Sequence, residues 1–429
     1  MNTGRVLARV DYAVVGGGIV ALAVARSIVQ RAERNTTVAM LERNSAAASE
    51  QTGHNSGVVH SGLFYSPGSN RATHCVAGHS RMLTFISENN LPLKRCGKLV
   101  VASSESEAHQ LNMLHSRGIS NGVEGLDMLS EREALRLEPN IRCPHGALAS
   151  HNTAVTDYEQ VALQMLHELH STGRMSAFYR FACDAIERNA DGELCVSGTE
   201  PGQAGPRKTV VCKKAVTCAG LRSDEVAAAS GDGNRSKKVF PFRGRYLALT
   251  KNAETKAPSA CIYPASSGRS FLGVHTTPYL SSARGSATLL GPAACLAPSR
   301  QGYSWSLSTF SAREIARNVC DTRFMRMAMR SPIKVMKQLY TEVSTKAFLN
   351  DAKRVLPWIS EKDVEPSFAG VRAQLLDDDG NLNDDFVIEH SGNVSGLVHV
   401  HNAPSPAATS SLSIAEEVTE KLMGQTMER

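Results

Sequence analysis

Short apolar runs alternate with helix-favouring segments along most of this 429-residue chain. The first run, 12–15, is long enough for a buried strand and leads into three glycines at 16–18. Segment 19–30 is mostly apolar and favours a helix, and 37–41 is a second β-type run that ends at Glu42. The order strand, glycine turn, helix, strand and acid predicts the first half of a nucleotide-binding βαβ unit.

The glycine turn has the features that a backbone needs to approach a pyrophosphate. Gly16 allows the tight turn after the strand, and Gly18 lacks a Cβ, so the main chain can come close to phosphates. Ala21 stands in the place of a third glycine and is small enough to pack the helix on the sheet. The helix begins at Ile19, where free amides and the positive end of the dipole would face an anion. A carboxylate at Glu42 could bind a ribose. This pattern alone does not separate FAD from NAD.

Similar elements return in the middle and at the end of the chain, with strand-rich segments between them. This alternation predicts a second domain that is inserted in pieces into the first. Further helices are predicted at 70–91, 105–117, 130–137, 157–171, 223–229 and 407–423, and strands at 99–102, 177–187, 193–198, 209–218, 238–250, 368–380, 386–389 and 397–401.

Composition narrows the class of protein. The net charge of +6, from 47 basic and 41 acidic residues, is too small to indicate a nucleic-acid partner, but it suits an anionic substrate or a membrane surface. The ten cysteines are scattered singly without metal-ligand spacing, which predicts free thiols in a reducing compartment and no metal site. Residues 1–10 contain Arg5 and Arg9 and no acid, so a short mitochondrial presequence is one interpretation and a cytoplasmic protein is the other.

Segment 311–358 is predicted to be helical and basic. Ten Lys or Arg residues and four acids lie between Arg313 and Arg354, with phenylalanine and methionine interleaved. A basic helix with soft apolar residues can lie on an anionic membrane, where a quinone acceptor would be met. A solvated helix that covers the second domain is the alternative.

Segment 52–66, TGHNSGVVHSGLFYS, combines glycines, two histidines and β-branched residues. It resembles the segment that lies against the flavin ring in the D-amino-acid-oxidase-like FAD-dependent oxidoreductases. The chain is most similar to one branch, the L-2-hydroxyglutarate dehydrogenases and oxidases. Further matches to this branch are FPFRG at 240–244, FLGVHTTP at 271–278, GP at 291–292, GVRAQ at 370–374, DDFVIE at 384–389 and HNAPSPAATSSLSIAEE at 401–417.

The resemblance implies an α/β fold: a Rossmann-like FAD-binding domain with an inserted α+β substrate domain built on an antiparallel sheet. The FAD-binding domain is expected at 1–90, 151–232 and 366–429, and the substrate domain at 91–150 and 233–365. The residues expected to contact FAD are Gly16, Gly18, Ile19, Glu42, Arg43, Thr52, His54, Asn55, Ser56, Gly57, Cys183, Ala219, Gly220, Pro404, Ser405, Ala407, Ala408 and Thr409.

The implied reaction is the oxidation of L-2-hydroxyglutarate to 2-oxoglutarate, with electrons passed on to a quinone or another acceptor. Oxidation of an alcohol beside a carboxylate needs a base of near-neutral pKa and a cation that holds the carboxylate. His60, His275 and Arg372 are the candidates for catalysis. His54, Arg243, Arg245 and Arg372 are the candidates for substrate binding. Core or loop histidines and surface arginines are the alternative interpretation of the same residues.

The chain departs from the family pattern at a few positions, which leaves specificity open: Ala21, Arg245, Thr276, Ala293 and His401. Three other functions are kept as alternatives. The first is a related oxidase of glycerol 3-phosphate or a D-amino acid. The second is a flavin-binding protein without turnover. The third, an NAD-dependent dehydrogenase, would leave the turn at 402–410 without a role, since the family places that turn at the flavin.

Overall fold

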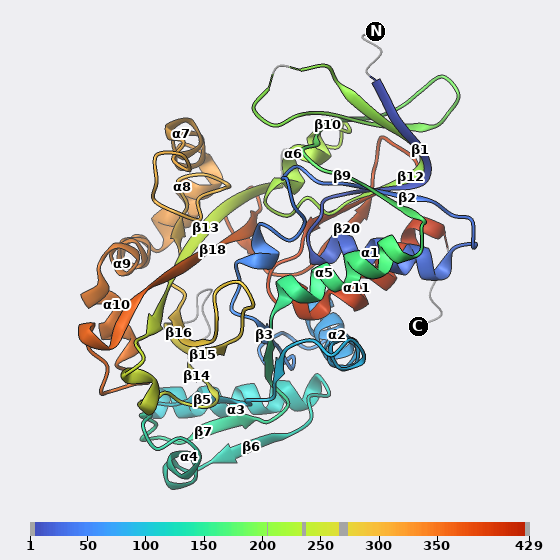
Figure 1. The fold of residues 1–429 in the computed structure, drawn as a ribbon. Coiled ribbons are helices and arrows are strands. Elements are labelled where there is room, and N and C mark those ends of the chain that lie inside the picture. The colour runs from blue at the N-terminus through green and yellow to red at the C-terminus, as the bar shows by residue number, and fades with distance from the viewer. Residues whose placement is uncertain (1–4, 204, 234–236, 266–272, 425–429) are drawn as a thin grey trace.

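The structure is a computed structural model that describes residues 5–203, 205–233, 237–265 and 273–424. The strands of the chain form two large sheets and one small sheet (Figure 1). The first sheet consists of β10 (Ala182–Arg188), β11 (Leu194–Thr199), β12 (Lys208–Thr217), β1 (Arg5–Val15), β2 (Val38–Leu41) and β9 (Met175–Phe178), with β21 (Leu397–Asn402) paired to β12 and β20 (Val387–His390) paired to β21.

The centre of the first sheet is parallel and buried on both faces. β1 pairs in parallel with β2 and β12, and β12 pairs in parallel with β21. Val14 packs into the core on one face, while Ala13 and Val15 pack on the other. A strand that is covered on both faces needs a continuous apolar run, which explains the pattern at 12–15.

Four helices pack together on one face of this sheet, and Figure 1 shows three of them side by side: α1, α5 and α11. The four are α1 (Ile19–Arg31), α2 (Asn70–Glu88), α5 (Tyr158–Ser171) and α11 (Ala407–Met423). The short helix α6 (Ser223–Ala228) contributes Val226 to the core on the opposite face. The predicted βαβ unit is therefore confirmed, together with the returning segments in the middle and at the end of the chain.

The second sheet is antiparallel except for one parallel pair, β5 with β14. Its strands, in spatial order, are β19 (Leu382–Asn383), β18 (Val364–Leu376), β13 (Lys238–Leu249), β16 (Ala287–Gly291), β15 (His275–Tyr279), β14 (Cys261–Pro264), β5 (Lys98–Val101), β7 (Ala147–Ser150) and β6 (Leu126–Leu129), and β17 (Cys295–Leu296) pairs with β13. A small third sheet contains β3 (Val58–Val59), β8 (Ala154–Thr156) and β4 (Leu93–Lys94).

The remaining helices surround the second sheet (Figure 1). They are α3 (Glu105–Ser120), α4 (Glu131–Leu137), α7 (Ala312–Val319), α8 (Thr322–Arg330), α9 (Pro332–Val343) and α10 (Thr345–Ala352). The basic segment is thus helical as predicted, but it is divided into four helices. Short 3-10 turns occur at η1 (Gln51–Gly53), η2 (Gly220–Arg222), η3 (Ala253–Lys256) and η4 (Glu361–Asp363).

One expected strand differs from the structure, and the structure adds detail to two further expectations. The strand expected at 177–187 is two strands, β9 and β10, separated by Arg180 in the left-handed region at φ 52°. β18, which begins at Val364, and β19 pair within the second sheet, although the last FAD-binding segment is expected to begin at residue 366. The division into domains stays a prediction. Residues 5–10 of the expected presequence form half of β1 and pair with β12, while residues 1–4, and 271–272 of the FLGVHTTP segment, lie outside the described residues.

Candidate active site

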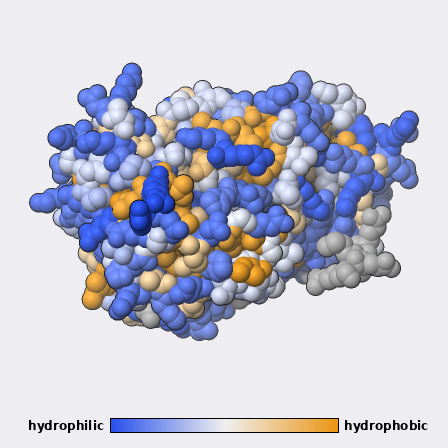
Figure 2. Space-filling model, turned by 90° about the horizontal axis from the view of Figure 1, so that it is seen from below, coloured by the Kyte–Doolittle hydropathy of each residue, from blue (hydrophilic) through white to orange (hydrophobic). Residues whose placement is uncertain are grey.

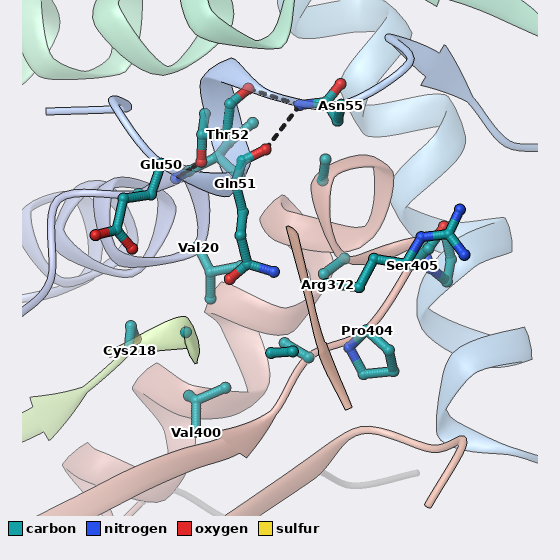
Figure 3. A pocket seen from close by; sticks show the side chains of 18 of the residues that line it. Val20, Glu50, Gln51, Thr52, Asn55, Cys218, Arg372, Val400, Pro404 and Ser405 are labelled. Atoms are coloured by element: carbon teal, nitrogen blue, oxygen red, sulfur yellow. Dashed lines mark hydrogen bonds between the residues drawn. The ribbon is translucent and has the colours of Figure 1, made fainter. Parts of the chain in front are cut away.

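A cavity of about 1240 Å³ lies where the carboxyl ends of the parallel strands meet the second sheet. Its wall combines the glycine turn, the 52–66 segment, β18 and the start of α11. Figure 3 shows side chains from these distant segments, among them Thr52, Asn55, Arg372 and Pro404, around the same space. In α/β folds this edge of the sheet is where ligands bind.

The glycine turn approaches the cavity with little room for any side chain. Gly16 has a φ of 121°, and a Cβ at this position would lie 2.4 Å from the carbonyl oxygen of Cys218. Gly18 precedes the first residue of α1 and has no side-chain cap. The amide of Ile19 donates to Thr52 Oγ1 at 3.0 Å, so the 52–66 segment is fastened to the start of the helix. The next amides of α1 have no partner within the helix and lie in the cavity wall, where an anionic group fits.

Acidic and basic side chains meet beyond the turn. Glu42 is buried, which raises the pKa of its carboxyl, and its Oε1 accepts from the amide of Asn44 at 2.7 Å. Arg43 and Arg222 both line the cavity; burial, followed by the positive charge of Arg222, lowers the pKa of Arg43. The Nε atoms of both arginines are buried without a hydrogen-bond partner. Arg222 also donates to Glu225 Oε2 at 2.8 Å, so Arg43 and the free Nε groups of both arginines are the donors that fit the diphosphate and ribose of a dinucleotide.

The opposite part of the wall is the start of α11. Pro406 precedes this helix, has no amide proton, and provides no side-chain cap. Neither Ser405 nor Thr409 acts as the side-chain cap of this helix. Instead, Thr409 Oγ1 accepts from the amide of His60 at 3.1 Å and lies 2.8 Å from the Tyr158 hydroxyl. The first residues of α11, Ala407, Ala408 and Thr409, line the cavity, and the positive end of the helix dipole suits negative charge on a bound ring.

His60 lines the cavity, and its imidazole is neutral. Burial, followed by the positive charge of Lys98, holds the pKa of His60 well below its usual range. Its Nδ1 is buried and has no hydrogen-bond partner in the structure. A neutral imidazole with an unpaired nitrogen can accept a proton. The hydrogen bond from the His60 amide to Thr409 fixes the backbone that carries this ring.

Arg372 enters the cavity from the middle of β18, opposite Phe242 of β13. Among the described residues, no carboxylate forms an ion pair with its guanidinium. Tyr246 lies beside Arg372 and Ser56: burial raises the pKa of the Tyr246 phenol, and both neighbours oppose the shift. An arginine fork without a carboxylate partner in a cavity is suited to the carboxylate of a substrate.

His54 also lines the cavity, but its imidazole is held by its own segment. Its Nδ1 lies 2.9 Å from the carbonyl oxygen of Glu50, and its ring packs on Tyr303 with 4.4 Å between the ring centroids. Burial lowers the pKa of His54. The side-chain amide of Asn55 donates to the carbonyl oxygens of Gln51 and Thr52, as drawn in Figure 3. These bonds make the segment a rigid part of the wall.

Most of the residues expected to contact the cofactor lie in the cavity wall. They are Gly16, Gly18, Ile19, Glu42, Arg43, Thr52, His54, Asn55, Ser56, Cys183, Ala219, Gly220, Pro404, Ser405, Ala407, Ala408 and Thr409. Gly57 lies outside this wall, where a Cβ would come within 2.5 Å of the carbonyl oxygen of Thr156.

Arg243 and Arg245 do not reach the cavity, nor are they solvated. They share one face of β13, as alternation predicts, but that face is covered by α9 and α10. Arg243 is buried and forms an ion pair with Glu342, whose side chain is fully buried. Arg245 donates to the carbonyl oxygen of Thr341 and to Thr345 Oγ1. Both side chains therefore hold the basic helices on the second sheet, and neither lines the cavity where the substrate carboxylate is expected.

His275 lies behind the cavity wall and is buried. Its ring stacks on Tyr263 with 3.9 Å between the centroids, and its Nδ1 lies 3.0 Å from the carbonyl oxygen of Gly273. Burial lowers the pKa of His275 to about 3. The imidazole is therefore a neutral core group in this structure, and His60 is the histidine that the geometry favours as the base.

Stability should fall in mild acid because several histidines are buried in the neutral form. An unfolded histidine has a pKa of about 6.5, so below that pH the unfolded chain binds more protons than the folded chain. Stability is therefore lost as pH falls through 6.5 towards the folded pKa of about 3 for His275. At pH 5 this residue alone costs about 2 kcal/mol. We expect Tm to decline from pH 7.5 to 5, and His275→Gln to decline less steeply; equal slopes would contradict this account.

Tyr65, Arg71 and Tyr246 are among the polar or aromatic groups of the wall that the sequence did not reveal as site residues. Arg71 lies over the ring of Tyr65 at 4.6 Å and donates to the carbonyl oxygen of Ser405 at 2.7 Å. Arg71 lies in the first turn of α2, and its sequence context predicts only an exposed helix residue. Tyr65 belongs to the 52–66 segment and was available as a signal, whereas Tyr246 was hidden in an apolar strand.

Comparisons with known proteins agree with this site. The sequence matches the FAD dependent oxidoreductase family over residues 11–421. It is similar to "L-2-hydroxyglutarate dehydrogenase, mitochondrial" of Nematostella vectensis, with 37% identity covering 96% of this chain and 90% of the relative. The corresponding human protein is 34% identical, covering 96% of this chain and 88% of that protein. "L-2-hydroxyglutarate dehydrogenase" of the bacterium Indibacter alkaliphilus is 36% identical, with 95% and 97% covered.

Solved structures share the fold at lower identity. The FAD-bound L-α-glycerophosphate oxidase of Mycoplasma pneumoniae has a TM-score of 0.72 at 21% identity, covering 97% of this chain and 95% of that one. Glycine oxidase of Geobacillus kaustophilus has a TM-score of 0.71 at 16% identity, with 98% and 96% covered. The chain therefore belongs to the FAD-dependent oxidoreductase family and, within it, to the L-2-hydroxyglutarate dehydrogenases.

Proposed function

We propose that the protein oxidises L-2-hydroxyglutarate to 2-oxoglutarate, with FAD as its cofactor. The observation that carries the proposal is the convergence of Arg372 and a neutral His60 on the cavity that also contains the glycine turn. The names of the relatives support the choice of substrate. FAD, when bound, supplies the acceptor for the hydride that leaves the carbon of the alcohol.

The residues of the chain supply binding and proton transfer. Arg372 holds the carboxylate beside the alcohol through two parallel hydrogen bonds, which fixes the orientation of the reacting carbon. A ring nitrogen of His60 takes the hydroxyl proton. Burial and the charge of Lys98 hold its pKa well below the near-neutral value expected for the base, and the negative charge of a bound substrate would raise it. The amides at the start of α11 face the charge that develops during reduction.

Turnover with an artificial electron acceptor tests the substrate directly. The holoenzyme is incubated with L-2-hydroxyglutarate, its D enantiomer, glycerol 3-phosphate or a D-amino acid, and 2-oxoglutarate is measured as the product. We expect the L enantiomer to give kcat/KM at least about 100-fold above the others, since each misplaced group costs roughly 3 kcal/mol of orientation. Faster oxidation of glycerol 3-phosphate or a D-amino acid would overturn the substrate assignment.

The proposal extends to the electron acceptor, a membrane quinone that the protein meets through α8 and α9. α9 exposes Ile333, Met336, Tyr340 and Val343 at helical spacing, and Ile333 is 83% exposed. Lysines and arginines flank this apolar stripe. Figure 2 shows apolar side chains among charged ones on the side where α9 and α10 lie in Figure 1. Within the described residues no helix has both the length and the apolar character to cross a bilayer. Peripheral contact with anionic lipid fits this surface.

Liposome binding checks the proposed contact. We expect binding to vesicles that contain an anionic lipid at low salt, and release as salt is raised, because the lysines and arginines act through screened charge. Ile333→Asp should weaken binding about tenfold or more, since it places a charge in the apolar stripe. Ile119→Asp is the matched control, because Ile119 is 59% exposed on α3. Unchanged binding of Ile333→Asp, or no binding at low salt, would contradict the proposal.

A mitochondrial location is part of the same proposal. Several relatives carry "mitochondrial" in their names, whereas the bacterial relative does not. A quinone acceptor in the inner membrane suits the basic surface, and a cytoplasmic location is the alternative.

A further inference from the structure

Lys98 is a buried cation without a polar partner. It is the first residue of β5 and only 3% exposed. Its ammonium nitrogen lies 4.3 Å from the ring centroid of Tyr263 and 5.2 Å from that of Phe64. Among the described residues, no carboxylate, hydroxyl or carbonyl oxygen accepts a hydrogen bond from it. Within the part of the chain that the structure describes, the ammonium group therefore faces two aromatic rings and no hydrogen-bond acceptor.

Such a burial is costly for the folded protein. An ammonium group that leaves water without gaining an acceptor loses several kcal/mol, and two aromatic faces recover only part of this loss. Burial lowers the pKa of Lys98, while the thiols of Cys261, Cys75 and Cys96 oppose that shift. A methionine here would fill the same space without this penalty. A cation kept at such a position is expected to have a ligand.

The surroundings of Lys98 connect it to the candidate active site. Phe64, which the ammonium faces, lines the cavity. Tyr263 stacks on His275, and the positive charges of both Arg372 and Lys98 act on that histidine. Lys98 is also the charge that acts most strongly on His60. Lys98 therefore lies near His60, the histidine that lines the cavity.

We propose that Lys98 binds the second carboxylate of the substrate, the one remote from the alcohol. This inference rests on the proposed function, in which the substrate is a five-carbon diacid. Such a diacid needs two cations, and Arg372 supplies one of them. Arg243 forms an ion pair with Glu342 of α9, and Arg245 donates hydrogen bonds to Thr341 of α9 and Thr345 of α10, so neither is available to the substrate. Arg71 and Arg117 line the cavity, but they donate to the carbonyl oxygens of Ser405 and Phe64. Lys98 lies behind Phe64 of the cavity wall and has no anion partner among the described residues.

Binding of two five-carbon acids tests the proposal without any turnover. Glutarate has two carboxylates and pentanoate has one, and calorimetry on the holoenzyme compares them. We expect glutarate to bind about 10- to 100-fold more tightly than pentanoate, since a hydrogen bond to a charged group contributes roughly 1.5–3 kcal/mol. Lys98→Met should abolish the difference, and Lys98→Arg should restore part of it. A difference that persists in Lys98→Met would overturn the assignment.

Turnover kinetics and thermal stability of Lys98→Met distinguish binding of the substrate carboxylate from a purely structural role and from an effect on His60. In Lys98→Met, KM for L-2-hydroxyglutarate should rise about 10- to 100-fold, while 2-hydroxypentanoate, which lacks the second carboxylate, should be oxidised as by the wild type. An equal loss with both substrates would show that Lys98 acts through His60 or the fold, and would overturn the proposal. Tm of Lys98→Met should equal or exceed the wild-type value, and a marked fall would indicate a structural lysine instead. Failure of the proposed function is distinguishable, because the wild type would then oxidise neither substrate while the binding comparison remains informative.

Discussion

Replacing Arg372 by methionine is expected to lower kcat/KM for L-2-hydroxyglutarate by about two to three orders of magnitude. Methionine keeps the length and the apolar stem of the side chain but removes both parallel donors. Loss of a bidentate pair to a carboxylate costs roughly 3–4 kcal/mol when the other partner is left without its cation. Arg372 lies at the centre of β18 and is part of the cavity wall, so the effect should fall on KM and kcat together. Steady-state kinetics with an artificial acceptor measures it.

Two variants serve as controls for this result. Arg372→Lys retains the charge but not the fork, and it should recover only part of the loss. Lys237→Met removes an exposed cation that pairs with Glu389, and it should leave kcat/KM unchanged within about twofold. Arg372→Met with wild-type kinetics would remove the anchor from the proposed mechanism and revive the alternative of a flavin-binding protein without turnover.

Gly16→Ala is expected to yield a folded protein that has lost FAD. The added Cβ would lie 2.4 Å from the carbonyl oxygen of Cys218, and a φ of 121° is unfavourable for alanine. Either the turn or the neighbouring strand end has to shift, and both contribute to the cavity wall. We expect FAD affinity to fall at least about 100-fold, because the backbone can no longer approach the phosphates. The ratio of flavin to protein absorbance after gel filtration measures the loss.

Gly122→Ala is the matched control for this substitution. Gly122 also has a positive φ, 75°, but no atom lies within 4 Å of the position of its Cβ. It should lose about 1 kcal/mol of stability from backbone strain and keep its full FAD content. Circular dichroism of Gly16→Ala should show native secondary structure. Full flavin content in Gly16→Ala would contradict the role of the turn.

Local patterns predicted the parts of the fold that local physics determines. The apolar run at 12–15, the glycines and the helix that follows form one βαβ unit because each element is encoded in its own residues. The basic segment 311–358 is helical for the same reason. The break between β9 and β10 within 177–187 could not be predicted, because Arg180 adopts the left-handed conformation there, which usually requires a glycine.

Candidate site residues could be predicted where a continuous motif, such as the glycine turn, forms the site by itself. They could not be predicted where the direction of a side chain depends on packing against distant segments. Arg372 reaches the cavity from a strand in the second sheet. Arg243 lies on the neighbouring strand, β13, and faces Glu342 instead. Both are arginines in β-type sequence, but Arg372 pairs with Phe242 and Arg243 pairs with Val371, so the two side chains lie on opposite faces of the sheet. His275 shows the same limit, since its motif resembles a site segment while its ring is packed behind Tyr263.

Lys98 is a candidate site residue that the structure reveals and the sequence does not. In sequence it is a single lysine at the start of an apolar strand, and it carries no signal. Burial without an acceptor, beside a ring of the cavity wall, is what makes it unusual. Polar groups left unsatisfied in a folded protein often mark the place of a ligand.

Anaerobic reduction of the bound flavin tests the central claim most directly. The purified holoenzyme is mixed with L-2-hydroxyglutarate in the absence of oxygen, and the flavin absorbance is followed as substrate is added. The account predicts that the yellow absorbance bleaches and that about one 2-oxoglutarate forms per flavin, because each oxidation delivers one hydride. Flavin that stays oxidised with an excess of L-2-hydroxyglutarate, in protein with full FAD content, would contradict it.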